Sequence, residues 1–319
     1  MSNKAIDYIE SSFLKDLIMN KNITDISFNG ETIFYVDNEL GRKQSNIVIT
    51  NDEAIDFIRQ IANYTEKQFS FVEPILDVSF GRYRLNAIHQ SIGRLNNEKV
   101  INFSIRIASL KNRIISDSGF MSNEMKLYLN DLIKNKKSIM IAGETGSGKT
   151  ELQKYLLSTL KDNSRIILID NLEELENLRT NPNIDLNSWQ VGKSNAKSFE
   201  DLIANALRCN PDWLIVSEAR GKEMSSMLTS VMSGHPLIST IHAYNIEEIP
   251  HRICRLIMQE SSNQKYEDIF IDVINHITNY IFVKKYVDNN GKVIRYISDI
   301  SLFNKENMKM DIIFHVERS

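Results

Sequence analysis

The sequence predicts an α/β protein of two domains, in which a smaller α+β domain precedes a domain built around a mostly parallel sheet. With 319 residues and 42% hydrophobic content, the chain can bury two ordinary cores. Residues 1–110 mix short strands of alternating polarity with one clear helix, whereas buried strands alternate with helices over 119–319. Between them, residues 111–118 show no sustained periodicity, so we expect a linker there.

One helix and two strands are well marked in the N-terminal domain. Thr50 and Glu53 form a capping-box pattern ahead of apolar residues at helical spacing. The stretches "YRLNAIH" and "VINFSIRIAS" alternate between apolar and polar residues, which is the period of a half-buried strand. Arg84 and Arg106 lie on the polar faces of these two strands. Weak surface ion pairs would explain both arginines, and a role toward a bound phosphate is the alternative.

The octet "GETGSGKT" separates a short apolar run from an amphipathic one. It fits the pattern G-x-x-x-x-G-K-[ST], in which backbone N–H groups wrap phosphates, the lysine reaches the β and γ oxygens and the last hydroxyl ligates Mg²⁺. Residues 138–142 predict a buried strand before the octet, and apolar spacing over 152–160 predicts a helix after it, so a helix N-terminus should face the phosphates. The expected phosphate-binding residues are Gly143, Glu144, Thr145, Gly146, Ser147, Gly148, Lys149 and Thr150.

Two further buried strands end in acids. Parallel sheets place the ends of such strands at the crevice where ligands bind. The run "WLIVSE" ends in Glu218, which could ligate Mg²⁺ through water or orient an attacking water, or could instead cap the following helix. The run "RIILID" ends in Asp170 and is followed by Glu173 and Glu174, which a solvated helix start would also explain.

Two histidines bracket the strand predicted in "SGHPLISTIHAYN". His235 precedes this strand and His242 ends it, so each is a candidate for a hydrogen bond to a phosphate. A structural role for either histidine remains the alternative.

Composition argues against several other kinds of site. The net charge of −3 and the pI of about 6.1 give no general electrostatic case for nucleic-acid binding. Cys209 and Cys254 have no neighbours at zinc-ligand spacing, so we expect reduced thiols and no zinc module. We expect neither a signal peptide nor a membrane span, because the pattern of the first is missing and no run of about 18 apolar residues occurs. Any membrane association should therefore be peripheral.

Four segments taken together resemble one protein family. "GETGSGKT", "DNLEEL", "LRCNPDWLIVSEARGKE" and "SGHPLISTIHA" follow the order and approximate spacing of the Walker A, Asp, Walker B and His boxes of the type II/type IV secretion and type IV pilus motor ATPases. In the N-terminal half, "ITDISFNG", "GRYRLNA" and "FSIR" are similar to stretches of the CpaF-like and VirB-type members. "IFVKKYVDNNGKVIRYISDI" is similar to their closing hairpin, with a turn expected at 289–291. The resemblance covers nearly the whole chain.

The resemblance implies a P-loop, RecA-like ATPase domain in the second half. Residues 143–150 would bind ATP and Mg²⁺, with Thr150 and Glu218 at the metal. Glu218 would be the Walker B acid that supports attack by water. His242 matches the His-box residue near the γ-phosphate, and His235 belongs to the same box.

The resemblance also implies roles for residues outside these two boxes. Asp170 and Glu174 match acids of the Asp box, while Asn171 stands where the family has its second acid, so Glu174 is the preferred candidate. Arg84 and Arg106 match arginines that the family's N-terminal domain directs at the nucleotide, where a guanidinium stabilises charge in phosphoryl transfer.

The function implied by the resemblance is that of a hexameric cytoplasmic ATPase whose domain motion powers a membrane secretion, conjugation or pilus-assembly machine. Its expected partners are further copies of itself in a ring and inner-membrane platform or secretion-channel proteins, with no stable nucleic-acid binding. Its expected location is the inner face of the cytoplasmic membrane. One alternative is a nucleic-acid motor, which would need a basic groove with stacking aromatics. Another is an ATP-binding scaffold without turnover, against which the intact Lys149, Thr150 and Glu218 argue. The cargo stays open.

Overall fold

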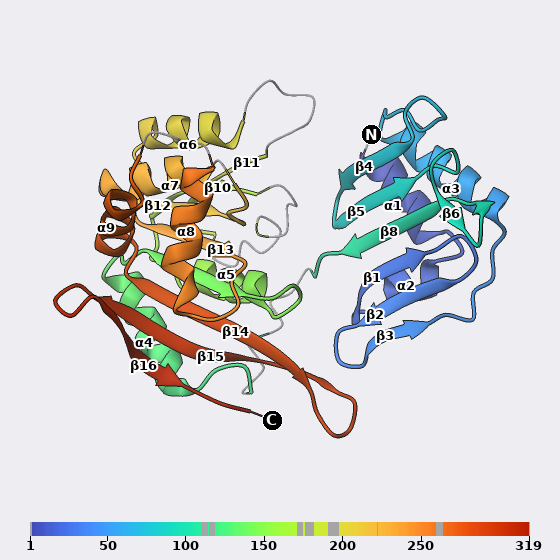
Figure 1. Cartoon of the computed structure of the whole chain (residues 1–319). Helices are drawn as coiled ribbons and strands as arrows, with labels where there is room; N and C mark the ends of the chain where they lie inside the picture. Colours follow the sequence, from blue (N-terminus) through green and yellow to red (C-terminus); the bar gives the residue numbers. More distant parts are fainter. Residues whose placement is uncertain are drawn as a thin grey trace. The chain divides into compact units, whose positions relative to one another are not determined.

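The chain divides into two compact units, whose elements are labelled in Figure 1. One unit comprises Met1–Leu110 and the short segment Val287–Ile294, and the other comprises Lys111–Tyr286 and Arg295–Ser319. The computed structural model describes residues 2–109, 114, 119–170, 175, 182–190, 198–221, 223–259 and 264–318. The predicted linker, 111–118, thus lies outside the described residues apart from Ile114.

In its described part, the first unit is a six-stranded antiparallel sheet in the order β3-β2-β1-β8-β5-β4. Three helices share one apolar core with the sheet. The helices are α1 (Ser2–Glu10), α2 (Lys15–Met19) and α3 (Asn51–Tyr64). The strands are β1 (Ile23–Phe28), β2 (Ile33–Asp37), β3 (Gly41–Gln44), β4 (Ile75–Phe80), β5 (Tyr83–Ile88) and β8 (Asn102–Ile107), with a separate ribbon of β6 (Arg94–Leu95) and β7 (Glu98–Lys99).

Local sequence patterns are confirmed in this unit. The Thr50 side chain accepts a hydrogen bond from the backbone N–H of Glu53, and the Glu53 carboxylate accepts one from the backbone N–H of Thr50, which completes the capping box of α3. Ile55, Ile58 and Ile61 are buried, as the helical spacing predicts. Strands β5 and β8 alternate between buried and more exposed residues along their length, so each has one polar face.

The second unit is built on an eight-stranded sheet in the order β11-β10-β12-β13-β9-β14-β15-β16 within the described chain. Neighbouring strands from β11 to β14 are parallel, and β15 and β16 are antiparallel to each other. The predicted α/β fold with a mostly parallel sheet and a smaller α+β unit before it is therefore confirmed. The strands are β9 (Ile139–Gly143), β10 (Arg165–Ile169), β11 (Asp185–Trp189), β12 (Trp213–Val216), β13 (Leu237–Ile241), β14 (Asn279–Val287), β15 (Val293–Asn304) and β16 (Lys309–His315).

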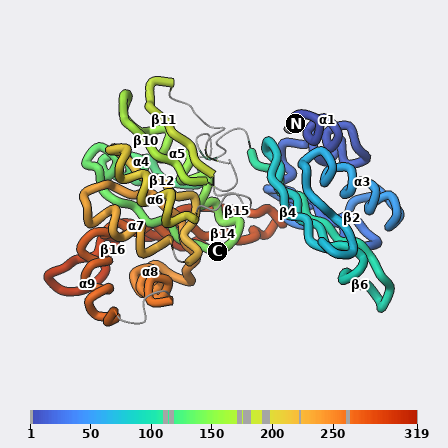
Figure 2. The backbone as a smooth tube through the Cα atoms, turned by 90° about the horizontal axis from the view of Figure 1, so that it is seen from above, coloured from blue at the N-terminus to red at the C-terminus, as the bar shows by residue number. Residues whose placement is uncertain are grey.

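Helices cover both faces of this second sheet (Figure 2). In β9, Ile139 and Ile141 belong to the core formed with α4 and α5, whereas Met140 and Ala142 belong to the core formed with α6 to α9. This alternation buries the strand on both faces, which is why its sequence is uniformly apolar. The helices are α4 (Asn123–Lys134), α5 (Lys149–Ser158), α6 (Phe199–Arg208), α7 (Glu223–Met232), α8 (Glu248–Met258) and α9 (Tyr266–His276).

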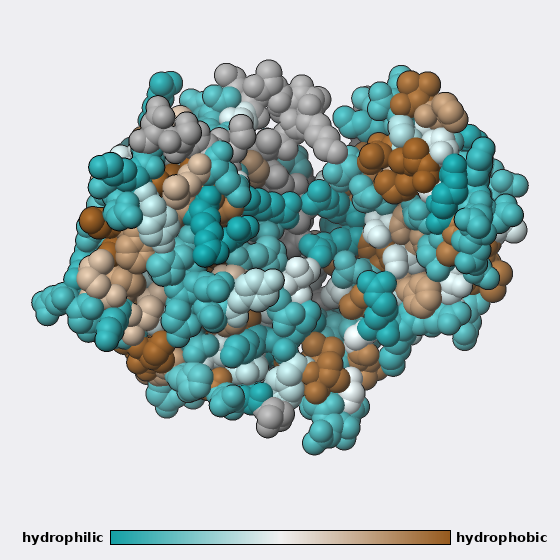
Figure 3. Space-filling view, in the orientation of Figure 1, coloured by the Kyte–Doolittle hydropathy of each residue, from teal (hydrophilic) through white to brown (hydrophobic). Residues whose placement is uncertain are grey.

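The surface is mostly hydrophilic on the face drawn in Figure 3, with apolar groups in small patches. Among the helices that the structure describes, none has both the length and the apolar character needed to span a bilayer.

Candidate functional site

The predicted phosphate-binding loop joins Gly143, the last residue of β9, to Lys149, the first residue of α5. Gly148 has a φ of 107°, and a Cβ at this position would lie 3.0 Å from the ring of Phe120. A Cβ on Gly143 would lie only 2.2 Å from the carbonyl oxygen of Val283 in β14. Both positions therefore require glycine, the first for a left-handed backbone and the second for close strand packing.

Lys149 supplies a cation inside this loop. The residue is buried, and its Nζ donates to the carbonyl oxygens of Gly143 at 2.8 Å and Glu144 at 2.9 Å. The same Nζ lies 3.4 Å from Nδ1 of His242, the residue that follows β13. Thr150 is the next residue along the first turn of α5. The N-terminus of α5 adds partial positive charge at this place, so the loop suits an anion with several oxygens.

Glu218 follows β12, and the structure brings it beside His242 and Arg220. Its Oε1 is 3.1 Å from Nε2 of His242, and its Oε2 accepts a hydrogen bond from Nη2 of Arg220 at 2.7 Å. Burial by itself raises the pKa of Glu218. The hydrogen bond from Arg220, the charge of Arg220 and the charges of His242 and Lys149 act in the opposite direction, and the pKa lies below its ordinary value. The carboxylate therefore stays ionised at neutral pH.

Hydrogen bonds from two sides fix the segment that carries Glu218. The hydroxyl of Thr240 in β13 donates to the carbonyl oxygen of Ser217 at 2.8 Å. From α5, the buried side chain of Gln153 donates through Nε2 to the carbonyl oxygen of Val216 at 2.9 Å. The helix that begins with the loop lysine is thus tied to the last residue of β12, two residues before Glu218. Relative motion of Lys149 and Glu218 is restricted as a result.

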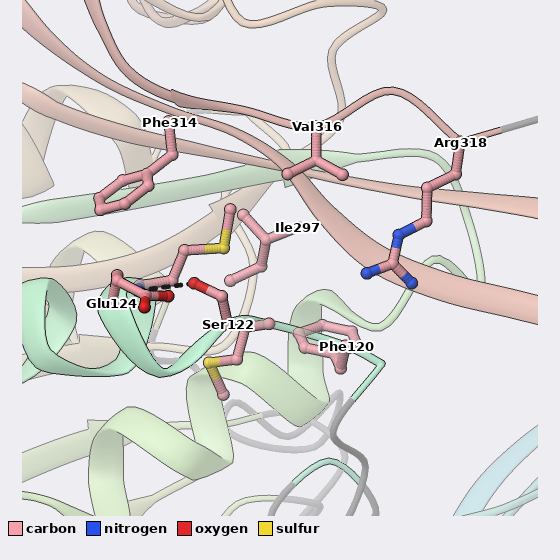
Figure 4. Close-up of a pocket in the computed structure, with 9 residues that line it drawn as sticks. Phe120, Ser122, Glu124, Ile297, Phe314, Val316 and Arg318 are labelled. Carbon is pink, nitrogen blue, oxygen red and sulfur yellow. Dashed lines mark hydrogen bonds between the residues drawn. The ribbon is translucent and has the colours of Figure 1, made fainter.

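A small apolar pocket of about 170 Å³ lies beside the loop (Figure 4). It shares a wall with the loop, because the ring of Phe120 borders both the pocket and Gly148. Figure 4 shows Ile297 of β15 near Val316, which follows β16, with Phe120 on the other side of Ile297 in this view. The lining residues are Phe120, Met121, Ser122, Glu124, Met125, Ile297, Phe314, Val316 and Arg318.

Arg84 and Arg106 lie in the first unit and are direct cross-strand partners on β5 and β8. Nε of Arg84 is 3.3 Å from Oδ1 of Asp77, and Nε of Arg106 is 3.4 Å from Oδ1 of Asp25. These contacts match the ion pairs that the sequence left open as one explanation. A role of either arginine toward a phosphate stays a prediction.

The other predicted residues differ in their positions. His235 precedes β13, and its Nδ1 is 3.2 Å from a carbonyl oxygen that precedes β12, so it lies at the opposite end of the strand from His242. Asp170 is buried at the end of β10, and its Oδ2 accepts a hydrogen bond from the backbone N–H five residues further on. Glu174 and Asn171 lie outside the described residues.

Several residues at the site were missed by sequence reasoning. Arg220 has a local signal, because it stands two residues after Glu218 in an irregular segment and can reach the same carboxylate. Gln153 also has one, because it stands four residues after Lys149 on the same face of α5. Lys285 and Arg295 have no such signal, since they are 140 and 149 residues from the loop residues whose carbonyl oxygens they contact.

Fold and site together define a P-loop α/β protein with a second, antiparallel α+β unit. A family model described as type II/IV secretion system protein matches residues 92–310. The chain belongs to the type II/IV secretion system protein family, which confirms the resemblance inferred from its four boxes.

A sequence relative agrees with this assignment, and a solved structure has the same fold. An uncharacterized protein of Bacillus anthracis is 29% identical over 326 residues, covering 96% of this chain and 72% of the relative. The type IV secretion system protein VirB11 of Bartonella quintana is 34% identical over 129 residues, 40% of this chain and 36% of that protein. The alignment thus spans well under half of that VirB11. The ATPase DotB of Legionella pneumophila has the same fold, with a TM-score of 0.69 at 19% identity over 92% of this chain and 80% of the DotB chain.

Proposed function

We propose that this chain is a Mg²⁺-dependent ATPase whose hydrolysis cycle powers a membrane secretion, conjugation or pilus-assembly machine. The observation that carries the proposal is the cluster of Lys149, His242 and Glu218 at the phosphate-binding loop. Hydrolysis of a phosphoanhydride needs a cation to bind the phosphates and an ionised carboxylate close to the γ-phosphate. The buried ammonium group of Lys149 and the carboxylate of Glu218 meet these two needs. Family membership and the similarity to a VirB11 protein support the secretion setting.

Each residue of the cluster has a distinct part in this proposal. Lys149 and the N–H groups of the loop bind the β- and γ-phosphates. Glu218 orients the attacking water and accepts its proton, because the surrounding positive charge keeps the carboxylate ionised. His242 lies with Nε2 3.1 Å from Oε1 of Glu218 and with Nδ1 3.4 Å from Nζ of Lys149, where its ring can donate to the γ-phosphate.

A magnesium ion fits the side chains at this site. Mg²⁺ takes one or two protein oxygens and completes its shell with water and phosphate oxygens. The hydroxyl of Thr150 would ligate the ion directly, and the carboxylate of Glu218 would reach it through a bound water. When bound, the ion would supply positive charge beside the β- and γ-phosphates.

The base of the nucleotide is assigned to the pocket bordered by Phe120. Phe120 contacts the loop at Gly148, so a nucleotide whose phosphates occupy the loop can extend its base into the pocket next to it. Apolar walls with few polar groups are typical of sites that bind a planar base. Among the lining residues, the Ser122 side chain already accepts a hydrogen bond from the backbone N–H of Met125.

The wider assignments rest on the family resemblance. Arg84 and Arg106 are assigned to the nucleotide phosphates, and Glu174 is assigned to the catalytic centre. Six copies would form a ring at the inner face of the cytoplasmic membrane, where an inner-membrane platform or secretion-channel protein receives the motion.

The test is steady-state hydrolysis of ATP by the purified chain, with Mg²⁺ or with EDTA, and with mass measured on the same samples. We expect slow Mg²⁺-dependent turnover by a ring of six copies. Lys149→Ala should abolish it, Lys161→Ala, a change of an exposed lysine, should not, and Arg106→Ala should lower it strongly. Turnover that survives Lys149→Ala would contradict the proposal. Normal turnover in Arg106→Ala would remove that arginine from the site.

A further inference from the structure

Two cations from the C-terminal strands hold the outer side of the phosphate-binding loop. Lys285 of β14 donates from Nζ to the carbonyl oxygen of Thr145 at 2.7 Å. Arg295 of β15 donates from Nε to the carbonyl oxygen of Gly146 at 2.7 Å. Consecutive peptide groups of the loop are thus each bound by a different cation. All four residues belong to the second unit.

This arrangement acts on the face of the loop that the phosphates would meet. The peptide bonds are trans, so the N–H of each peptide group points away from its carbonyl oxygen. When the carbonyl oxygens of Thr145 and Gly146 are bound by β14 and β15, the N–H of Gly146 is directed to the other side. The N–H of the next peptide group, on Ser147, donates to the carbonyl oxygen of Glu144 within the loop at 3.3 Å, so the N–H that the two cations direct toward a phosphate is that of Gly146. A charged donor on a carbonyl oxygen also polarises the peptide, which strengthens its N–H as a donor.

We propose that Lys285 and Arg295, here named the loop brace, are positioning residues that shape and polarise the phosphate-binding loop for its anion. The proposal rests on the proposed nucleotide-binding function and adds a dependence of phosphate affinity on the two C-terminal strands. The brace acts through the loop backbone and takes no part in proton transfer.

An ordinary surface ion pair explains the contacts less well. Lys285 does approach a carboxylate, with Nζ 3.7 Å from Oε2 of Glu144, but its shorter contact is the 2.7 Å hydrogen bond to the loop carbonyl. Gly146 has a φ of 74°, and a Cβ built on it would lie 3.6 Å from Nζ of Lys285, so the brace packs closely against the loop backbone. Cations aimed at backbone oxygens restrain the loop itself.

Removal of either residue of the brace should lower the affinity for ATP and leave the rate of hydrolysis nearly unchanged. The brace stabilises the loop equally around substrate and transition state, so its removal should raise KM and leave kcat within about threefold. Loss of one charge-assisted hydrogen bond at this partly exposed place should weaken ATP binding by about tenfold. Inorganic tripolyphosphate, which has the phosphates without the base, should lose affinity by the same factor.

The experiment compares Lys285→Met and Arg295→Met with Lys284→Met in the full chain. Lys284 is the adjacent exposed lysine on the same strand, so it controls for loss of charge. Affinities for ATP and for tripolyphosphate, kcat and the thermal midpoint without ligand are measured for each protein. We expect weaker binding of both ligands in the first two variants only, an unchanged midpoint, and recovery of affinity in Lys285→Arg.

Each outcome decides the matter. If wild-type protein shows no ATP binding that depends on Lys149, the proposed function fails and the brace fails with it. If wild-type protein binds ATP and the brace variants bind both ligands as Lys284→Met does, the brace is refuted and the proposed function stands. Weaker ATP binding with unchanged tripolyphosphate binding, or a fall in kcat at constant affinity, also refutes the brace.

Discussion

Replacement of Gln153 by glutamate tests how α5 is tied to β12, the strand that precedes Glu218. Gln153 is 1% exposed, and its Nε2 donates to the carbonyl oxygens of Val216 at 2.9 Å and Ile238 at 3.4 Å. An ionised carboxylate would place negative charge against both oxygens, so the new group should stay protonated and donate in place of the amide. Gln153→Glu should therefore be close to wild-type stability at acid pH and much less stable at neutral pH.

The magnitude follows from proton linkage. A glutamate in the unfolded chain has a pKa of about 4.3. Above that pH, the folded variant binds more protons than the unfolded one, so the free energy of unfolding falls by about 1.4 kcal/mol per pH unit. A side chain held protonated at pH 7 thus costs about 3.7 kcal/mol, within the range of about 3–5 kcal/mol for an uncompensated buried charge.

Urea unfolding followed by tryptophan fluorescence measures this cost, because both tryptophans, Trp189 and Trp213, lie in the second unit. The series runs from pH 5 to pH 8 with wild type and Gln264→Glu, a change at an exposed glutamine, as controls. The reasoning is refuted if Gln153→Glu follows the controls across the series, since the glutamine would then not be bound between α5 and β12.

Two further predictions concern the pocket and Glu218. Ile297→Trp should fill the pocket and weaken ATP binding by about tenfold or more, while the affinity for tripolyphosphate stays unchanged. Leu127→Trp, on the exposed face of α4, should change neither affinity. Equal loss of affinity for both ligands in Ile297→Trp would place the base elsewhere. Arg220→Met removes the hydrogen bond and the charge that lower the pKa of Glu218, so burial should then raise that pKa. The carboxylate must be ionised to act as a base, so as the pH is lowered, kcat of Arg220→Met should begin to fall at a higher pH than kcat of wild type. An acid limb of the pH profile at the same pH in both proteins would argue against Glu218 as the base.

Features defined by a few consecutive residues could be predicted from the sequence. The phosphate-binding loop is set by the glycines at 143 and 148, because each meets a backbone or packing demand that other residues cannot. The capping box of α3 depends only on Thr50 and Glu53. Glu218 was also predicted from its position, because a buried parallel strand presents its last residues at the loop.

Features that depend on tertiary packing could not be predicted in the same way. Lys285 and Arg295 reach the loop only because β14 and β15 follow β9 in the sheet order, which hydrophobic periodicity does not specify. His235 and His242 were both candidates for a phosphate because hydrophobic periodicity locates the strand between them but does not say which of its ends lies at the loop. In the structure only His242 lies at the loop, and His235 lies at the other end of β13. The pattern of Arg84 and Arg106 predicted their polar face correctly, while their carboxylate partners come from neighbouring strands.

The central claim is that Glu218 is needed for the hydrolysis of ATP, whereas Lys149 and the N–H groups of the loop bind it. The most direct measurement is ATP affinity and single-turnover hydrolysis of Glu218→Gln beside wild type and Glu267→Gln, a change at an exposed acid of α9. The account predicts ATP affinity within about threefold of wild type and hydrolysis at least about 100-fold slower in Glu218→Gln alone. Hydrolysis at the wild-type rate in Glu218→Gln would contradict the claim.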